Sequence, residues 1–304
     1  MIEQGYPKKV HIREVGPRDG LQNESSFIQT KDKIEWINLL SDTGLKYIEV
    51  TSFVNPSWIP SLSDAESVAK QISKSPEMTY AALVPNMKGL NRAIENGIDE
   101  ISVFISASET HNKKNINKTI SETEIVLSEV VKESLSNQKT VRGYISTVFG
   151  CPYEGKVEID QITRLADSLF DMGINELSLG DTIGIATPLQ VKYVLETFLK
   201  RYPSDSIAMH FHNTRGTALA NVLASLEMGI SKFDSSLGGL GGCPYAPGAS
   251  GNLATDDLNY MLTNMGIQTN IDSDKLNTAA LFIQNKLQKP LESHTMKYSS
   301  SQQT

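Results

Sequence analysis

Eight short runs rich in β-branched and apolar residues recur along the 304-residue chain, and stretches with helical periodicity lie between them. We expect strands at 9–15, 47–53, 79–84, 100–106, 141–148, 176–181, 207–212 and 232–238. Strands that alternate with helices indicate βαβ units around a parallel sheet. Eight such units predict an α/β fold that closes into a (β/α)8 TIM barrel.

The helical spacing of apolar residues is clearest at 30–44, 119–135 and 216–229. Two further helices are expected from about residue 253 onward, the second near 272–288. We therefore predict a single catalytic domain over 1–290 that includes extra C-terminal helices, followed by a polar, disordered tail at 291–304. The alternative is an open doubly wound sheet. It would need a G-x-G-x-x-G turn after an early strand, and "VGPRDG" at 15–20 lacks that spacing.

The composition, 39% hydrophobic and 21% charged, is typical of a globular chain with a large core. A net charge of −7 argues against general attraction to nucleic acid or to anionic membranes. The chain has two distant cysteines, a charged N-terminus without an apolar segment and no apolar run near 18 residues. We therefore expect a cytoplasmic protein without disulfides or a membrane span.

Polar residues stand where barrel strands end, which is where such barrels place their catalytic groups. Arg18 and Asp19 follow the first strand; a solvated surface ion pair is the alternative interpretation. Glu49 alternates with Ile48 and Val50, so it should point into the barrel while the aliphatic residues face the helices. A buried carboxylate is costly without a partner, so Glu49 needs a metal ion, an arginine or a hydrogen-bond network.

His210 and His212 are separated by one residue, so both point to the same face of a strand. Two imidazoles that converge in a barrel mouth indicate metal ligands rather than core histidines. The glycine-rich segment "GGLGGCPYAPGASGN" at 238–252 follows the last strand, carries Cys243 and ends on Asn252. Asp19, His210, His212 and Asn252 would give Mg²⁺ or Mn²⁺ two nitrogens and two oxygens and leave positions open for substrate oxygens.

These motifs resemble those of the 3-hydroxy-3-methylglutaryl-CoA (HMG-CoA) lyases over nearly the whole chain. The matching segments are "VGPRDGLQNE" (15–24), "KKNIN" (113–117), "GCPYEG" (150–155), "SLGDTIG" (178–184) and "GGLGGCPYAPGASGNLATDDL" (238–258). The cysteine loop is specific to this family. The R-D-G turn and the H-x-H pair are shared with Claisen-type barrels such as isopropylmalate and homocitrate synthases. The resemblance implies a TIM barrel, a divalent cation, cleavage of the acyl-CoA to acetyl-CoA and acetoacetate, and a homodimer.

By motif match, the resemblance assigns Asp19, His210, His212 and Asn252 to the metal. It places Arg18, Glu49, Asp181 and Cys243 at functional positions. Asn213 stands where aspartate is as common, and we expect it to tune the orientation of the ligands rather than to bind.

Cleaving a carbon–carbon bond β to a thioester requires that a tertiary hydroxyl lose its proton, that an enolate be stabilised and that its carbon be protonated. A metal ion would lower the pKa of the hydroxyl. Arg18 would donate hydrogen bonds to the thioester oxygen. Glu49, Asp181 and His210 are unranked candidates for moving the hydroxyl proton. Cys243 would exchange a proton with the acetyl carbon, whereas Cys151 suits a structural role better.

Lys113, Lys114 and Asn115 lie in a basic segment, 111–118, which we expect to be a loop that either meets the CoA phosphates or is simply solvated. Three other functions compete. One is a lyase for a longer 3-hydroxy-3-alkylglutaryl-CoA. A Claisen-type synthase would use acetyl-CoA and an oxo acid, and we would expect it to lack the cysteine loop and often to carry a regulatory domain beyond this chain. A non-catalytic acyl-CoA- or metal-binding barrel would be expected to have lost Arg18, a histidine or Cys243.

Overall fold

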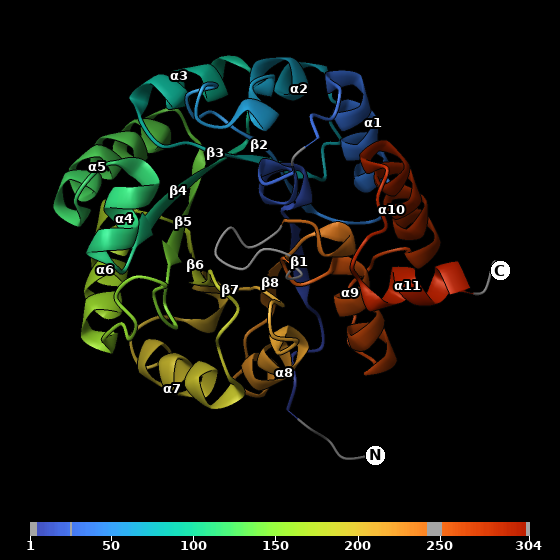
Figure 1. Cartoon of the computed structure of the whole chain (residues 1–304). Coiled ribbons are helices and arrows are strands. Elements are labelled where there is room, and N and C mark those ends of the chain that lie inside the picture. Colours follow the sequence, from blue (N-terminus) through green and yellow to red (C-terminus); the bar gives the residue numbers. More distant parts are fainter. Residues whose placement is uncertain (1–4, 25, 242–250, 302–304) are drawn as a thin grey trace.

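A closed barrel of parallel strands forms the centre of the protein, in a computed structural model that describes residues 5–24, 26–241 and 251–301. Each strand pairs with its neighbours in the sequence, and β8 pairs with β1 to close the ring (Figure 1). The strands are β1 (His11–Glu14), β2 (Tyr47–Ser52), β3 (Thr79–Leu83), β4 (Glu100–Ser106), β5 (Thr140–Ser146), β6 (Glu176–Asp181), β7 (Ile207–Phe211) and β8 (Lys232–Ser235). The predicted (β/α)8 TIM barrel is confirmed.

Helices surround the barrel and follow its strands in turn (Figure 1). They are α1 (Thr30–Ser41), α2 (Ala65–Gln71), α3 (Met87–Glu95), α4 (Glu109–Ile116), α5 (Ile120–Ser136), α6 (Ile159–Met172), α7 (Pro188–Phe198), α8 (Ala218–Glu227), α9 (Thr255–Asn264), α10 (Ser273–Leu287) and α11 (His294–Ser301). The C-terminal helices cover the outside of the ring beside β1 and β8, where α10 packs on α1.

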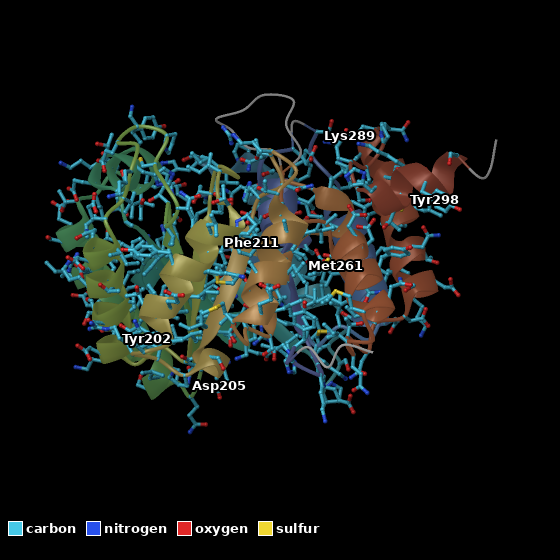
Figure 2. The ribbon with its side chains drawn as sticks, turned by 90° about the horizontal axis from the view of Figure 1, so that it is seen from below. Tyr202, Asp205, Phe211, Met261, Lys289 and Tyr298 are labelled. Atoms are coloured by element: carbon cyan, nitrogen blue, oxygen red, sulfur yellow. The ribbon has the colours of Figure 1, made fainter. Side chains whose placement is uncertain are left out.

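Alternation along the strands separates an apolar layer from a polar interior. Ile48 and Val50 of β2 are buried in the core between strands and helices, whereas Glu49 is buried with its side chain inside the barrel, against Arg18. Because successive side chains of a strand point to opposite faces, the aliphatic residues pack outward against the helices and the polar residues line the inside of the barrel. Figure 2 shows the barrel from the side, with Asp205 at the end where β7 begins and Lys289 at the opposite end.

Two segments differ from their sequence-based expectations. The basic segment 111–118 is not a loop: α4 covers most of it, with the side chain of Ser108 accepting from the His111 N–H and with Asn117 left-handed at the end. The segment expected to be a disordered tail contains α11. Leu291 and Met296 are buried there and anchor it. None of the helices in the described ranges is long and apolar enough to cross a membrane.

Candidate metal centre and active site

A tight turn after β1 positions Arg18 and Asp19. Residues Gly16–Gly20 form one π-helical turn at the carboxyl end of the strand. A Cβ on Gly16 would lie 2.5 Å from Glu14 Oε1, so a larger residue would displace this carboxylate oxygen. The buried Glu14 carboxylate accepts from the N–H of Gly16 at 2.8 Å and from the N–H of Leu237 at 3.0 Å, which fastens the turn to the segment after β8.

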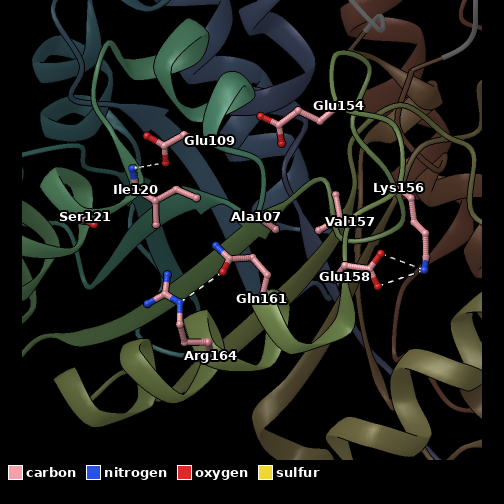
Figure 3. A pocket seen from close by; sticks show the side chains of 10 residues that line it. All are labelled: Ala107, Glu109, Ile120, Ser121, Glu154, Lys156, Val157, Glu158, Gln161 and Arg164. Carbon is pink, nitrogen blue, oxygen red and sulfur yellow. Dashed lines mark hydrogen bonds and ion pairs between the residues drawn. The ribbon is translucent and has the colours of Figure 1, made fainter.

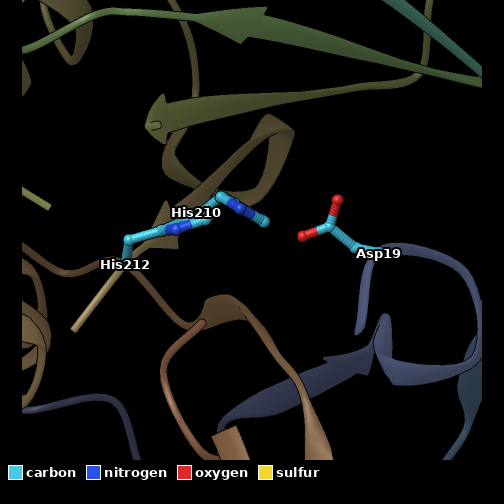
Figure 4. Close-up of side chains that lie close together, drawn as sticks. All are labelled: Asp19, His210 and His212. Carbon is cyan, nitrogen blue, oxygen red and sulfur yellow. The ribbon is translucent and has the colours of Figure 1, made fainter. Parts of the chain in front are cut away.

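Asp19, His210 and His212 come together at the carboxyl end of the barrel. One ligand atom from each lies within 4.8 Å of the others, and Figure 4 shows the Asp19 carboxylate facing the two imidazole rings. Asn252 lies beside them. Its backbone forms an isolated antiparallel β-bridge with His212, and its Nδ2 donates to Asp19 Oδ2 at 2.7 Å.

The donor atoms of this cluster fit a cation. Asn252 Oδ1 and His212 Nδ1 are buried and have no hydrogen-bond partner among the described residues. Buried polar atoms normally have partners, so these atoms indicate a missing one. The cluster offers one carboxylate, two imidazoles and one amide oxygen, a set that suits a divalent metal ion.

The electrostatic surroundings of the cluster keep Asp19 and His212 in the deprotonated forms that can bind a metal ion. Burial opposes ionisation of Asp19, but Arg18 and then the two histidines hold its pKa well below the usual range. Burial, followed by the nearby His210, lowers the pKa of His212 to about 4, so its ring is neutral near pH 7. A metal ligand must be deprotonated, and both residues meet that condition.

Arg18 links the cluster to Glu49. Its Nε donates to Glu49 Oε2 at 2.6 Å, and its Nη1 contacts Asp19. No described residue accepts from Nη2. Glu49 Oε1 is buried and lacks a partner among the described residues. An arginine donor and a carboxylate acceptor therefore both have capacity to bind a further group beside the cluster.

Asp181, at the end of β6, is occupied by its own loop. Its two oxygens accept from the backbone N–H groups of Ile185 at 2.9 Å and Ala186 at 3.0 Å. Burial raises the pKa of Asp181 to about 6 despite these bonds. Of the three candidates for moving the hydroxyl proton, Asp181 thus has both oxygens engaged, whereas Glu49 has one without a partner.

A layer of buried charges beneath the cluster was missed by the sequence analysis. Arg142 Nε donates to Glu176 Oε1 at 2.7 Å, and its Nη2 donates to Asp234 Oδ1 at 2.6 Å. Asp234 Oδ2 lies 3.2 Å from His210 Nδ1. Period two would have found these residues, because Arg142 alternates with Val141 on β5 in the way that Glu49 alternates with its neighbours.

The predicted CoA contacts lie on α4, which follows the carboxyl end of β4. Lys113, Lys114 and Asn115 are exposed. Lys113 Nζ lies 3.5 Å from Glu109, and Lys114 Nζ lies 4.9 Å from the centre of the Tyr153 ring. The structure thus places all three at the outer rim, where Lys113 already faces an acidic partner.

A pocket of ≈ 530 Å³ adjoins this rim (Figure 3). Its lining includes Glu109, Glu158, Lys156 and Arg164. Lys156 pairs with Glu158 at 3.0 Å, and Arg164 pairs with Glu124 at 3.0 Å. Both of these cations of the pocket therefore already face an acidic partner.

The remaining candidates are two cysteines and Asn213. Cys243 lies outside the described residues. Cys151 is buried, with its thiol 3.0 Å from Ser108 Oγ and with N–H groups of Tyr153 and Glu154 directed at the sulfur, which suits a structural role. Asn213 Oδ1 accepts from the N–H of Ala218 at 3.2 Å, and the Asn213 N–H donates to Gly251 O at 2.8 Å. Asn213 therefore connects the loop after β7 to the segment that carries Asn252.

Known proteins resemble this chain closely in sequence and in structure. The HMGL-like family model matches residues 9–283. The hydroxymethylglutaryl-CoA lyase of Bacillus subtilis (strain 168) is 60% identical over 291 residues, which are 96% of this chain and 97% of that protein. The crystal structure of the B. subtilis HMG-CoA lyase superposes with a TM-score of 0.96 at 59% identity, covering 97% of this chain and 99% of that one.

A second solved structure shows what such a protein binds. An HMG-CoA lyase from Acinetobacter baumannii, in complex with coenzyme A and 3-methylmalate, matches with a TM-score of 0.92 at 41% identity and covers 95% of each chain. The match to the family model over most of the chain, together with 60% identity along almost its full length, shows that this protein belongs to the hydroxymethylglutaryl-CoA lyase family.

Proposed function

We propose that this protein cleaves 3-hydroxy-3-methylglutaryl-CoA to acetyl-CoA and acetoacetate by a metal-dependent retro-Claisen reaction. The observation that carries the proposal is the convergence of Asp19, His210, His212 and Asn252 beside Arg18 and Glu49 in a chain 60% identical to a lyase of that name. Mg²⁺ or Mn²⁺ held by the four cluster residues would polarise the substrate oxygens and lower the pKa of the tertiary hydroxyl.

Arg18 would stabilise the enolate. Its Nη2 has no acceptor among the described residues, while Glu49 and Asp19 fix the plane of the guanidinium through its other nitrogens. A donor held in place before charge develops on the thioester oxygen lowers the barrier without reorganisation.

Glu49 is the group best placed to take the hydroxyl proton. Oε1 is buried without a partner among the described residues, and Oε2 is held by Arg18 Nε. An oxygen that lacks a donor inside the barrel can accept a proton from a substrate bound against the cluster. Cys243 remains our proposed proton donor to the acetyl carbon; its segment begins and ends at Gly241 and Asn252, beside Asp19.

The CoA moiety would extend from the barrel mouth toward the rim formed by α4. Lys113, Lys114 and Asn115 are exposed there and could contact its phosphates. The homodimer and the cytoplasmic location stay predictions, and sedimentation velocity on the purified protein tests the first.

The decisive experiment supplies two substrate sets to one metal-loaded preparation. With HMG-CoA we expect acetoacetate and acetyl-CoA, complete loss of activity in EDTA, and recovery with Mg²⁺ or Mn²⁺. A longer 3-hydroxy-3-alkylglutaryl-CoA, run in parallel, reports the acyl-chain preference.

The second set, acetyl-CoA with an oxo acid such as 2-oxoisovalerate, tests the synthase alternative. Release of free CoA from this mixture, with HMG-CoA left intact, would overturn the lyase proposal. Full HMG-CoA cleavage by a His210→Ala, His212→Ala double variant would overturn the metal assignment.

A further inference from the structure

The two histidines of the cluster have different surroundings. His212 Nδ1 is buried without a partner among the described residues, whereas His210 Nδ1 faces a carboxylate oxygen of Asp234 at 3.2 Å. His210 and Asp234 are opposite one another in the β7–β8 register, so the strand pairing itself sets this contact. Asp234 is fully buried inside the barrel.

The other contacts of Asp234 keep it an acceptor. Arg142 Nη2 donates to Oδ1 at 2.6 Å, and Ser178 Oγ donates to Oδ2 at 2.9 Å. Arg142 is itself fully buried and has a second carboxylate, Glu176, on its far side at 2.7 Å. Arg142 and Ser178 therefore hold the Asp234 carboxylate in place, with its Oδ2 directed at His210 Nδ1.

From this geometry we infer that Asp234 is a positioning residue, which fixes His210 in the tautomer that carries its proton on Nδ1 and leaves Nε2 free to bind the metal ion. A carboxylate can only accept, so a lone pair on Nδ1 would face another lone pair at 3.2 Å. The hydrogen on Nδ1 removes that repulsion. The inference rests on the proposed metal-dependent function. It concerns how His210 is oriented and protonated to bind the metal ion, and it does not concern the reaction of the substrate.

Asp234→Asn should reverse the tautomer without changing the shape of the residue. Arg142 can only donate, and its Nη2 lies 2.6 Å from Oδ1 whereas its Nη1 lies 3.4 Å from Oδ2, so the single amide oxygen should take the Oδ1 position, nearer to Nη2. The amide NH₂ then takes the place of Oδ2 and donates to His210 Nδ1, which moves the ring proton to Nε2. A metal ion can bind such a ring only after the tautomer is restored, and we expect the Kd for Mn²⁺ to rise by about 10- to 100-fold.

The matched control is Glu176→Gln. It makes the same change from acid to amide on the other side of Arg142, but Glu176 contacts Arg13, Arg142 and Lys232 and not His210. We expect Glu176→Gln to lower Tm while it leaves the Mn²⁺ Kd within about threefold of the wild-type value. If Asp234 had a purely structural role, Asp234→Asn would raise the Mn²⁺ Kd no more than Glu176→Gln does for the same loss in Tm.

Two measurements on the whole protein test the inference without using activity. Titration calorimetry gives the Mn²⁺ Kd of each variant. Long-range ¹H–¹⁵N spectra of the metal-free protein report the tautomer of His210, and the chain has only five histidines to assign. We expect an Nδ1–H ring in the wild type and an Nε2–H ring in Asp234→Asn.

Each outcome bears on one claim. An Nε2–H tautomer in the wild type overturns the inference even if Asp234→Asn does not fold, and so does wild-type Mn²⁺ affinity in a folded Asp234→Asn. Failure of the wild-type protein to bind Mn²⁺ or Mg²⁺ would instead refute the metal in the proposed function, and the tautomer measurement would still decide the role of Asp234.

Discussion

The guanidinium of Arg18 makes two contacts at once and has a third nitrogen without an acceptor among the described residues. Nε binds Glu49 and Nη1 binds Asp19, so the side chain is oriented by both a candidate proton acceptor and a candidate metal ligand. A lysine would keep the charge, but a single ammonium cannot hold these two carboxylates and also aim a donor at the substrate.

Arg18→Lys should therefore lower kcat for HMG-CoA by about 10²- to 10³-fold, with only a modest rise in KM, because the lost donor acts mainly when charge reaches the thioester oxygen. Steady-state assays at saturating metal measure both constants. Arg201→Lys, at a half-exposed arginine paired with Asp167 on the surface, is the control and should leave them unchanged. A normal kcat with a greatly raised KM would show that Arg18 serves ground-state binding alone.

Glycine conformation decides how the element after β8 meets the metal cluster. Gly241 has a φ of +104°, and a Cβ there would lie 2.5 Å from Asn252 Nδ2 and 3.1 Å from Asp19 O. The backbone at Gly241 thus passes close to the hydrogen-bonded pair of Asp19, which follows β1, and Asn252, which follows β8.

Gly241→Ala should displace the Asn252 amide, raise the Mn²⁺ Kd at least tenfold and lower kcat with it. Gly229→Ala is the matched control, since its φ is +82° but no atom lies within 4 Å of the added Cβ. Both variants place an L-residue at positive φ, which costs about 1–2 kcal/mol or more, and only Gly241→Ala adds a collision with the metal cluster. Equal Mn²⁺ affinities in calorimetry would contradict the close approach.

Some elements could be predicted from the sequence and others could not, and the two groups form for different physical reasons. The strands follow from β-branched runs, and Glu49 could be placed inside the barrel from alternation alone. The helix α4 could not, because "ETHNKKNI" has no apolar periodicity; its cap at Ser108 and the left-handed Asn117 define it instead.

The candidate site divides in the same way. The convergence of Asp19 with His210 and His212 could be predicted because barrel strand ends share one rim. The pairing of Asp234 with His210 depends on the strand register, and the engagement of both Asp181 oxygens depends on the path of a loop. Neither the strand register nor the path of the loop can be predicted from the local sequence.

The stability of the whole molecule should depend on pH through Glu14. This carboxyl lies where β1, the segment after β8 and Thr255 at the start of α9 meet, and Thr255 Oγ1 donates to it at 2.6 Å. Burial raises the pKa of Glu14 from 4.5 to about 7. The folded state therefore binds more protons than the unfolded chain between these values, and the stability that this group contributes is present below pH 4.5 and lost as the pH rises through 7.

Glu14→Gln keeps the shape of the side chain and removes the titration. The difference in free energy of unfolding between wild type and variant should change by up to about 3 kcal/mol from pH 4.5 to pH 8, in the direction that favours the variant at high pH. Urea unfolding at several pH values measures it. A difference that stays constant with pH would show that Glu14 has an ordinary pKa in the folded protein.

The hydrogen bond from Asn252 to Asp19 spans 233 positions of the chain, across the seam where β8 pairs with β1. A ribosome that adds about 5–20 residues per second makes these two residues roughly 10 to 50 s apart. Throughout that interval β1 has a free edge and Asp19 has none of its partners from the far end of the chain. The cation that we propose for this site can meet all four ligands only after residue 252 has been made, so metal loading would separate molecules that contain Asn252 from ones truncated before it.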